Sequence, residues 1–245
     1  MSGTRSGQAA HYDGLLAEHY SWMFGDSRAG AVEAQAAWLS RAGVDAPGRC
    51  VDLGCGSGFQ SEALLRCGAT SVLAVDLSQP LLDELDAAVP DARLTTVCAD
   101  LMDFPSHLSG PADTVVCMGD TLTHLDSKAA VQSLFDTVAA ALAPGGMVLL
   151  SWRDLSNPPS GPDRFIPLRS TPDRIMTCVL DDAGERVRVT DVVHERNGDR
   201  WTMQASEYFK LKLSPDWVRQ ALGNVGLAPA FEATERGLTV LRANA

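Results

Sequence analysis

The stretch that decides the fold is Val51-Asp52-Leu53-Gly54-Cys55-Gly56-Ser57-Gly58. It follows a short apolar run and precedes a helical pattern, which predicts a glycine-rich turn between a strand and a helix. Glycines suit such a turn because the chain bends tightly there and a ligand has to approach the backbone closely. Several classes of nucleotide-binding protein share turns of this kind. The turn therefore indicates an α/β fold and leaves the ligand to be decided by the neighbouring strands.

The residues around this turn alternate between short apolar runs and helical stretches, as in a parallel sheet. The apolar runs are bounded by Gly, Pro or Asp, which is typical of strands buried on both faces. The predicted strands are Cys50–Leu53, Ser71–Asp76, Leu94–Ala99, Thr114–Met118 and Met147–Trp152, with Ala230–Glu235 and Thr239–Arg242 near the C-terminus. The predicted helices are Phe59–Cys67, Gln79–Val89, Lys128–Leu142, which Pro144-Gly145-Gly146 stops, and Pro215–Val225.

Two segments depart from this alternation. The first 48 residues predict helices, over Tyr12–Phe24 and Ala31–Ala42. After the fifth predicted strand, Ser156–Pro172 predicts a loop rich in Pro and Ser, and three runs with period-two alternation follow, separated by sequences typical of hairpin turns. The three runs are Arg174–Asp181, Arg186–Glu195 and Arg200–Leu213. We expect an antiparallel meander inserted after the fifth strand.

Composition limits the classes of function. The chain has 245 residues and a formal net charge of −11, so its surface should repel nucleic acid, whose binding needs clustered Lys and Arg. No apolar run reaches the roughly 18 to 20 residues that span a bilayer, and residues 1–10 lack the layout of a signal peptide. We therefore expect a cytoplasmic protein that binds neither nucleic acid nor a membrane.

The cysteines predict no metal centre. They form no CxxC pair and no His/Cys ligand spacing, and most lie inside apolar runs, where a reduced thiol behaves as a small hydrophobe. The six are Cys50, Cys55, Cys67, Cys98, Cys117 and Cys178. We expect structural thiols.

Three features around the glycine-rich turn narrow its ligand. Asp76 ends the second predicted strand, twenty residues beyond Gly56, where a carboxylate can accept hydrogen bonds from both hydroxyls of a ribose. Asp100-Leu101 closes the third strand, where an acidic side chain and a backbone N–H can contact an adenine edge. The turn reads D-x-G-x-G-x-G, and Phe59 stands where the third glycine of a dinucleotide fingerprint is missing. The last feature argues against a pyrophosphate.

In this order and spacing the motifs resemble those of class I methyltransferases that depend on S-adenosylmethionine (SAM). The resemblance covers about residues 49–152 and, more loosely, the last helix and strands. It implies SAM as the cofactor and a Rossmann-like, seven-stranded, mostly parallel sheet whose last strand is antiparallel. The cofactor-binding residues that it implies are Asp52, Gly54, Gly56, Gly58, Asp76, Leu77, Asp100, Leu101 and Met118.

The expected organisation has four segments. Residues 1–48 form an N-terminal helical lid, and 49–155 form the SAM-binding core. Residues 156–213 form the inserted antiparallel region, as a lid or substrate region, and 214–245 add the C-terminal helix and the last two strands of the core.

The acceptor is expected at the carboxyl ends of the strands, where open α/β sheets bind ligands. There, Gly119–Leu125 (GDTLTHL) and Ser151–Asp154 (SWRD) resemble two segments of glycine and sarcosine N-methyltransferases. The arginine of the second segment binds the substrate carboxylate in that family, so the resemblance implies the same role for Arg153. The departures at Asp120 and Asp154 argue against glycine itself and leave a small polar acceptor.

Methyl transfer needs an oriented nucleophile and, for an amine or a hydroxyl, removal of a proton. His124 is the candidate base because its reference pKa lies near neutrality, and Asp120 could orient an amine by its charge. Tyr20 and Trp22 are candidate substrate contacts. Each has a structural alternative: a packed histidine, a capping carboxylate, helix core packing for the two aromatics, and a surface ion pair for Arg153.

The sequence therefore predicts an enzyme that methylates nitrogen or oxygen of a small molecule, with specialised metabolism as the expected setting. One alternative is a SAM-using enzyme that catalyses another reaction, and a second is a non-catalytic SAM or nucleoside binder or an accessory subunit. A third, a nicotinamide dehydrogenase, is disfavoured by Asp100 and by the form of the turn. A homo-oligomer stays open, as does the role of the inserted region as a lid or an interface.

Overall fold

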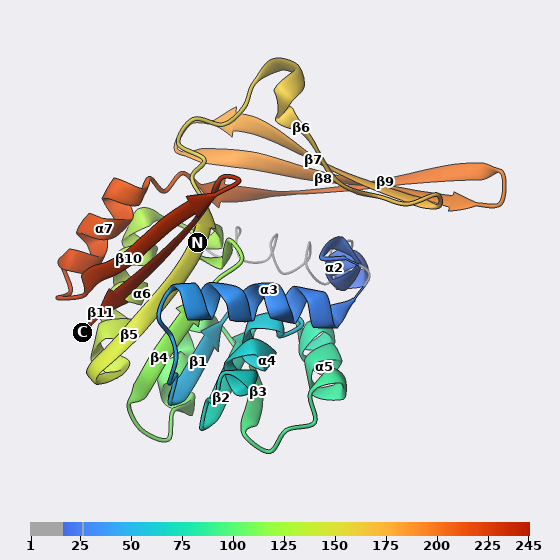
Figure 1. Cartoon of the computed structure of the whole chain (residues 1–245). Helices are drawn as coiled ribbons and strands as arrows, with labels where there is room; N and C mark the ends of the chain where they lie inside the picture. Colours follow the sequence, from blue (N-terminus) through green and yellow to red (C-terminus); the bar gives the residue numbers. More distant parts are fainter. Residues whose placement is uncertain (1–16, 26) are drawn as a thin grey trace.

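The computed structural model describes residues 17–25 and 27–245, and its central element is a seven-stranded sheet (Figure 1). The strands are β1 (Arg49–Leu53), β2 (Ser71–Asp76), β3 (Leu94–Cys98), β4 (Ala112–Cys117), β5 (Leu142–Arg153), β10 (Ala228–Glu235) and β11 (Leu238–Asn244). Their order is β10-β11-β5-β4-β1-β2-β3, and β11 runs antiparallel to both of its neighbours. The Rossmann-like fold with an antiparallel last strand is confirmed.

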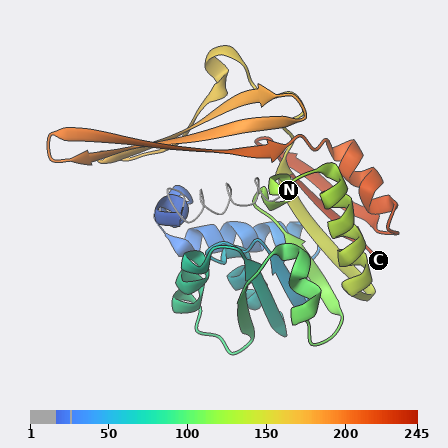
Figure 2. The same cartoon turned by 180° about the vertical axis from the view of Figure 1, so that it is seen from behind.

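Helices cover both faces of this sheet (Figures 1 and 2). One face carries α3 (Arg28–Arg41), α4 (Phe59–Arg66) and α5 (Gln79–Ala88); the other carries η2 (Leu101–His107), α6 (Lys128–Ala141) and α7 (Pro215–Gly223). Serine caps set several helix starts, since a side-chain oxygen there accepts a free backbone N–H. Ser27 accepts from Gly30 N at 3.0 Å, which is why α3 begins at Arg28, three residues before the predicted Ala31.

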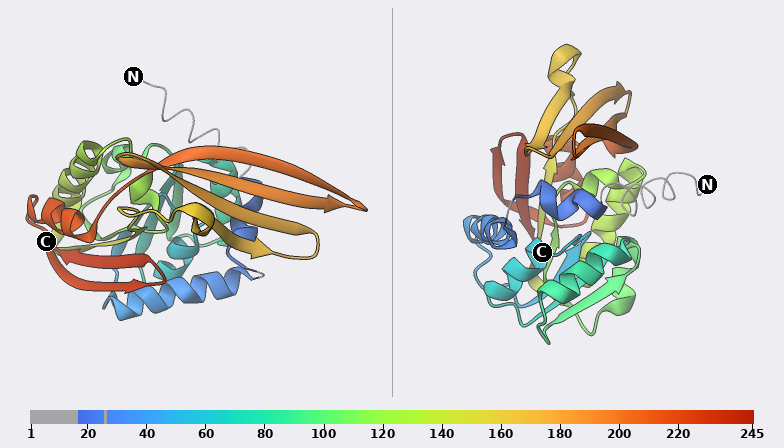
Figure 3. Two further views of the ribbon diagram at one scale, coloured as in Figure 1. Left: turned by 90° about the horizontal axis from the view of Figure 1, so that it is seen from above. Right: turned by 90° about the vertical axis from the view of Figure 1, so that its right-hand side faces the viewer.

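A second, antiparallel sheet lies across the carboxyl ends of the parallel strands (Figures 1 and 3). It consists of β6 (Phe165–Ser170), β7 (Arg174–Ala183), β8 (Arg186–Asn197) and β9 (Arg200–Leu211), in that order. The predicted insertion is confirmed, but it has four strands, and the predicted loop Ser156–Pro172 contains η4 (Gly161–Arg164) and β6. Pro167 makes β6 hard to predict from the sequence, because proline is unfavourable inside most strands. An edge strand tolerates a proline, and the register shifts between Pro167 and Arg169.

The fifth strand also begins earlier than predicted. Helix α6 stops at Ala141 and β5 starts at the next residue, so the stretch Pro144-Gly145-Gly146 lies inside the strand. Gly145 takes a positive φ of 76°, and the pairing with β4 shifts register between Ala112 and Thr114. A bulged strand start of this kind has the composition of a turn, which explains why the predicted fifth strand began only at Met147.

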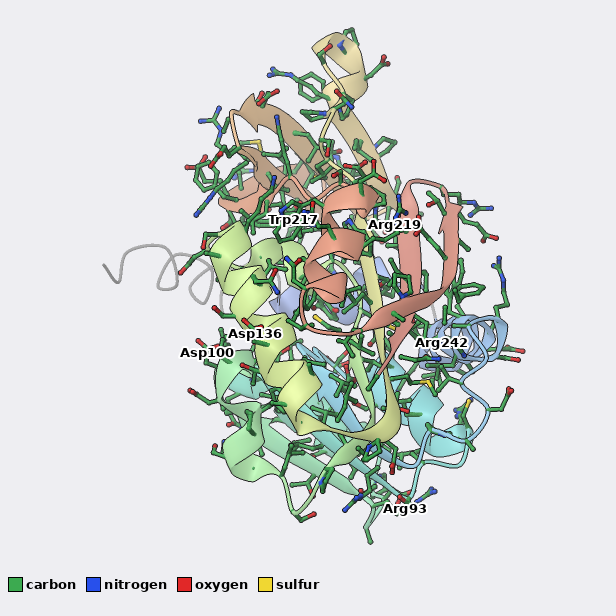
Figure 4. All side chains as sticks on the ribbon, turned by 90° about the vertical axis from the view of Figure 1, so that its left-hand side faces the viewer. Arg93, Asp100, Asp136, Trp217, Arg219 and Arg242 are labelled. Atoms are coloured by element: carbon green, nitrogen blue, oxygen red, sulfur yellow. The ribbon has the colours of Figure 1, made fainter. Side chains whose placement is uncertain are left out.

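Hydrogen bonds to the core hold the segment that leads from β9 of the second sheet into α7. Buried Trp152, at the end of β5, donates from Nε1 to the carbonyl of Leu213 at 2.8 Å, two residues beyond β9. Helix α7 then packs on α6, where Gln132 Nε2 donates to the carbonyl of Ala221 at 3.1 Å. Figure 4 shows α7, which carries the labelled Trp217 and Arg219, beside α6. The C-terminal end of β9 is thereby fixed over the core.

Helix α2 (Ala17–Met23) is the described part of the predicted helix Tyr12–Phe24; residues 12–16 lie outside the described residues. All six cysteines carry free thiols; four of them are buried, Cys67 is half-buried and Cys98 is exposed. Among residues 17–25 and 27–245, no helix has the length and apolar character needed to cross a membrane.

Candidate functional site

The glycine-rich turn has the backbone geometry that its sequence demands. Gly54, Gly56 and Gly58 all take positive φ, at 70°, 54° and 79°. The turn is tied to the next strand, because the N–H groups of Gly54 and Cys55 both donate to the carbonyl of Val75, at 2.8 and 3.1 Å. A residue with a Cβ rarely adopts this φ, so three such positions within five residues need glycine.

The same glycines also make room for protein side chains. A Cβ on Gly54 would lie 2.3 Å from Thr121 Cγ2, and one on Gly58 would lie 2.2 Å from Leu85 Cδ1. A Cβ on Gly56 would lie 2.9 Å from the hydroxyl oxygen of Tyr20. The sequence-based reason for these glycines, approach of a ligand, was therefore incomplete: the turn is also a contact point for three other elements.

Asp76 joins the glycine-rich turn to the turn after β2. Its Oδ2 accepts from Gly56 N at 2.8 Å, and its Oδ1 accepts from Ser78 N at 2.9 Å, directly before α5. A carboxylate has about four acceptor positions, so it can accept ribose hydroxyls beside these two N–H groups. The bond to Ser78 N is the one that the capping alternative describes, while the predicted contact of Asp76 with a ribose stays a prediction.

Asp52 is buried beneath the turn and accepts a hydrogen bond of 2.6 Å from Ser61 Oγ on α4. Burial raises the pKa of the Asp52 carboxyl to about 7, against the opposing effect of the Ser61 hydrogen bond. This bond joins β1 to α4 on either side of the turn, and the predicted contact of Asp52 with the cofactor stays a prediction.

We expect Asp52→Asn to change how stability depends on pH. A carboxyl whose pKa is raised by folding stabilises the fold at low pH, and this contribution is lost as the pH rises from about 4 to about 7. The variant, which does not titrate there, should gain stability relative to the wild type across that window. Urea unfolding at pH 5 and pH 8 measures it, and parallel pH profiles for the two proteins would contradict the assignment.

Helix α2 lies on the glycine-rich turn. The Tyr20 ring stands against Gly56. Ser21 Oγ donates to the carboxylate of Glu84 on α5 and lies 3.1 Å from Ser57 Oγ. Burial raises the pKa of the Tyr20 phenol above its usual range, so its hydroxyl is neutral. The structure brings Tyr20 to the predicted site.

Several carboxylates add to the raised pKa of the Tyr20 phenol. After burial, the largest contribution to its raised pKa comes from the charge of Asp76, and Asp52 and Asp120 add smaller ones. Asp76 ends β2, whereas Asp120 follows β4. All of these negative charges favour the neutral phenol of Tyr20.

Trp22, the second aromatic candidate, contacts the inserted sheet. The guanidinium carbons of Arg169 and Arg174 lie 4.7 and 5.0 Å from the centre of its ring, and Arg169 Nη1 donates to its carbonyl. Trp22 also packs against Met176 and Val193. The packing alternative describes these contacts, while the predicted contact with a substrate stays a prediction.

Three of the other predicted cofactor residues lie at the ends of β2 and β3. Leu77, directly after β2, is 50% exposed. Asp100 caps η2 by accepting from Met102 N at 2.9 Å, and Leu101 begins that helix. The side chain of Met118 is buried in the core cluster that includes α4, and its carbonyl accepts from Thr121 Oγ1 at 2.9 Å.

Asp120 is held by three donors from the protein. Its Oδ1 accepts from the backbone N–H of Arg153 at 2.6 Å, and its Oδ2 accepts from Arg153 Nη1 at 2.6 Å and from Lys210 Nζ at 3.0 Å. Asp120 is 3% exposed and takes a positive φ of 75°, a conformation that Asp tolerates better than most residues. Although burial alone would raise the pKa of its carboxyl, the charges of Lys210 and Arg153 hold it well below the usual range.

His124 ends η3 (Thr121–His124), the single turn that follows Asp120. Its ring stacks on that of Tyr208 from β9, with centres 5.2 Å apart and an interplanar angle of 21°. The predicted base is thus at the carboxyl edge of the sheet and under the inserted sheet.

Tyr208 and Lys210 are the two site residues that sequence analysis missed. The alternation of Arg200–Leu213 indicates that they share a face, but it does not show which face covers the core. A lysine in a strand with exposed aromatic residues is typical of a strand face exposed to solvent. Only the fold reveals that the amino group of Lys210 reaches Asp120.

Comparison with known proteins shows what the core is similar to. Residues 50–146 match the family described as a methyltransferase domain. The whole fold is similar to that of the SAM-bound amino pentose methyltransferase CalS10 of Micromonospora echinaspora, with a TM-score of 0.71, 20% identity, and 94% and 96% of the two chains covered. Residues 50–146 thus form a methyltransferase domain. The family of this domain is SAM-dependent. At 20% identity, the likeness to CalS10 shows a shared fold and nothing more.

Two curated relatives match the methyltransferase domain over part of their length. A ubiquinone biosynthesis O-methyltransferase of Xanthomonas euvesicatoria is 36% identical over 109 residues, 42% of each chain. The cypemycin N-terminal methyltransferase of a Streptomyces species is 32% identical over 146 residues, 54% of this chain and 58% of the relative. The matches thus span about half the length of these relatives. Neither is a glycine or sarcosine N-methyltransferase, so that finer resemblance stays a prediction.

Proposed function

We propose that this protein transfers a methyl group from SAM to nitrogen or oxygen of a small-molecule acceptor. The observation that carries the proposal is the position of Asp76, whose carboxylate joins Gly56 N to Ser78 N inside a methyltransferase domain. A carboxylate at the end of the second strand is where a nucleoside ribose can be held. The match to O- and N-methyltransferases supports both acceptor atoms.

The residues around the glycine-rich turn fit SAM. We assign ribose binding to Asp76, adenine contacts to Leu77, Asp100 and Leu101, and the methionine portion to the turn, with Tyr20 beside it. When bound, SAM supplies a carbon already activated for displacement by its sulfonium. The chain itself then has to hold the acceptor in line and take its proton.

We assign the proton to His124. A protonated amine has to lose a proton before it attacks, and a hydroxyl loses one as it attacks. The ring of Tyr208 holds the imidazole at the carboxyl edge of the sheet. Asp120 is assigned a positioning role instead of the predicted contact with the acceptor, because its two oxygens already accept three protein hydrogen bonds.

Arg153 is the residue through which we expect the acceptor to be recognised. Its Nη1 binds Asp120, yet its side chain is 55% exposed, which leaves the guanidinium edge accessible to an acceptor. Arg153→Ala should raise the KM for the acceptor roughly tenfold or more, as expected for loss of a charge-assisted hydrogen bond, and leave SAM binding intact. Steady-state kinetics and calorimetry measure the two quantities.

Arg188→Ala is the matched control, because Arg188 is also about half exposed and pairs with Asp181 on the second sheet. Unaltered acceptor kinetics in Arg153→Ala would return Arg153 to the role of a surface ion pair.

The activity can be tested without knowing the acceptor. Purified protein is incubated with SAM and a panel of paired small amines and alcohols, and S-adenosylhomocysteine (SAH) and methylated products are followed by mass spectrometry. SAH together with a product heavier by one methylene unit is the expected result. An acceptor consumed while SAM stays intact would contradict methyl transfer and point to another SAM-dependent reaction.

A further inference from the structure

Strand β9 of the inserted sheet brings two side chains to the loop after β4. Tyr208 and Lys210 are two residues apart, so they project from the same face of the strand. The ring of Tyr208 stacks on His124, and the ammonium of Lys210 bonds Asp120. These contacts identify the face of β9 that looks onto the core, and they attach the sheet at both ends of η3.

The bond between Lys210 and Asp120 is buried on both sides. The side chains are 13% and 4% exposed, and Arg153 completes a cluster in which two cations share one carboxylate. A buried ion pair of this kind is sensitive to geometry, because a charge that loses its partner there is left without solvent to replace it. The cluster therefore holds the second sheet at a defined position over the core.

Asp120 connects the position of the second sheet to that of His124. The carbonyl of Asp120 accepts from Thr123 N at 2.9 Å and from Thr123 Oγ1 at 2.7 Å, and its own N–H donates to the carbonyl of Ser151 at 3.2 Å. The carboxylate and the backbone of Asp120 thus fix the start of η3, whose last residue is His124. A shift of the carboxylate would rotate a helix of only four residues.

We propose that Lys210 is a positioning residue for His124, acting through Asp120 and η3. In this arrangement the inserted sheet is part of the catalytic site: β9 sets the backbone of His124 through Lys210 and the plane of its ring through Tyr208. The proposal rests on the assigned role of His124 in methyl transfer, but the coupling between β9 and η3 can be measured without it.

The test compares three variants of the full chain. Lys210→Met keeps the length of the side chain and removes its charge, Lys210→Arg restores a cation, and Lys212→Met is the matched control. Lys212 is 15% exposed, but its partner Asp182 is 59% exposed and far in sequence from η3. Hydrogen–deuterium exchange is followed in peptides that cover residues 119–126, with and without SAH.

We expect Lys210→Met to raise amide exchange in residues 119–126 about tenfold, Lys210→Arg to restore most of the protection, and Lys212→Met to leave it unchanged. Unchanged exchange in Lys210→Met, or an equal rise in Lys212→Met, would overturn the proposal. SAH affinity should stay constant in all three variants. If SAH fails to bind even the wild type, the proposed function falls while the exchange comparison still decides the coupling.

Kinetics give a second, independent readout. With an acceptor from the amine and alcohol panel, kcat of Lys210→Met should fall about 10- to 100-fold, as misplacement of a catalytic group by about 1 Å does, with the KM for SAM unchanged. Lys210→Arg should recover most of kcat. A fall in SAM binding instead of kcat would assign Lys210 to the cofactor side and contradict the positioning role.

Discussion

Asp76→Ala is expected to weaken binding of SAH by about 100-fold or more. The carboxylate is the proposed acceptor for the ribose hydroxyls, and hydrogen bonds to a charged group contribute about 1.5–3 kcal/mol each. The substitution also frees Gly56 N and Ser78 N, which loosens the glycine-rich turn. Isothermal titration calorimetry with SAH measures the affinity directly.

Asp86→Ala is the control for Asp76→Ala. Asp86 is an exposed carboxylate on the neighbouring α5 whose partner is Thr96 on β3. It should bind SAH as the wild type does. Asp76→Asn, which keeps one acceptor oxygen, should fall between the wild type and Asp76→Ala. Wild-type affinity in Asp76→Ala would refute the ribose assignment and leave Asp76 as a capping residue.

Asp120→Ala is expected to lower the free energy of unfolding by about 3–5 kcal/mol, the range for removing one partner of a buried ion pair. The carboxylate is the common acceptor for Lys210 and Arg153, so the variant leaves the largely buried Lys210 ammonium without its counter-charge. Loss of the three hydrogen bonds should also free the start of η3. Urea unfolding at pH 7 measures the change.

The control for Asp120→Ala is Asp182→Ala, which removes the exposed partner of Lys212 and should change stability little. Asp120→Asn should retain part of the stability, because its amide oxygen can still accept from the backbone of Arg153. A small effect of Asp120→Ala, equal to that of Asp182→Ala, would mean that the cluster does not hold the second sheet in place.

The parallel core could be predicted because its signals are local. β1, β2 and β4 are short, mostly buried runs, and the turn after β1 combines three glycines with a carboxylate at the end of β2. The hydrogen bond between Asp76 and Gly56 follows from this order, since β1 and β2 are neighbours in register and Leu53 pairs with Val75. The contacts around the glycine-rich turn were therefore predictable to the extent that they join strand ends.

The second sheet and its part in the site could not be predicted to the same degree. Pro167 hides an edge strand, and period-two alternation in β9 does not reveal which face is covered. Lys210 reaches Asp120 across 90 residues of sequence, and no local pattern encodes a contact at that separation. The position of Asp120 after β4 predicts that it lies at the carboxyl edge of the sheet, but its bonds to Arg153 and Lys210 depend on partners that only the tertiary structure supplies.

The most direct test of the central claim is calorimetric titration of the purified protein with SAH and, separately, with NADH. The proposed function predicts micromolar binding of SAH alone, because the turn around Gly56 and Asp76 is assigned to a nucleoside that carries no pyrophosphate. Binding of NADH alone, or of neither compound, would contradict the claim that this site holds SAM.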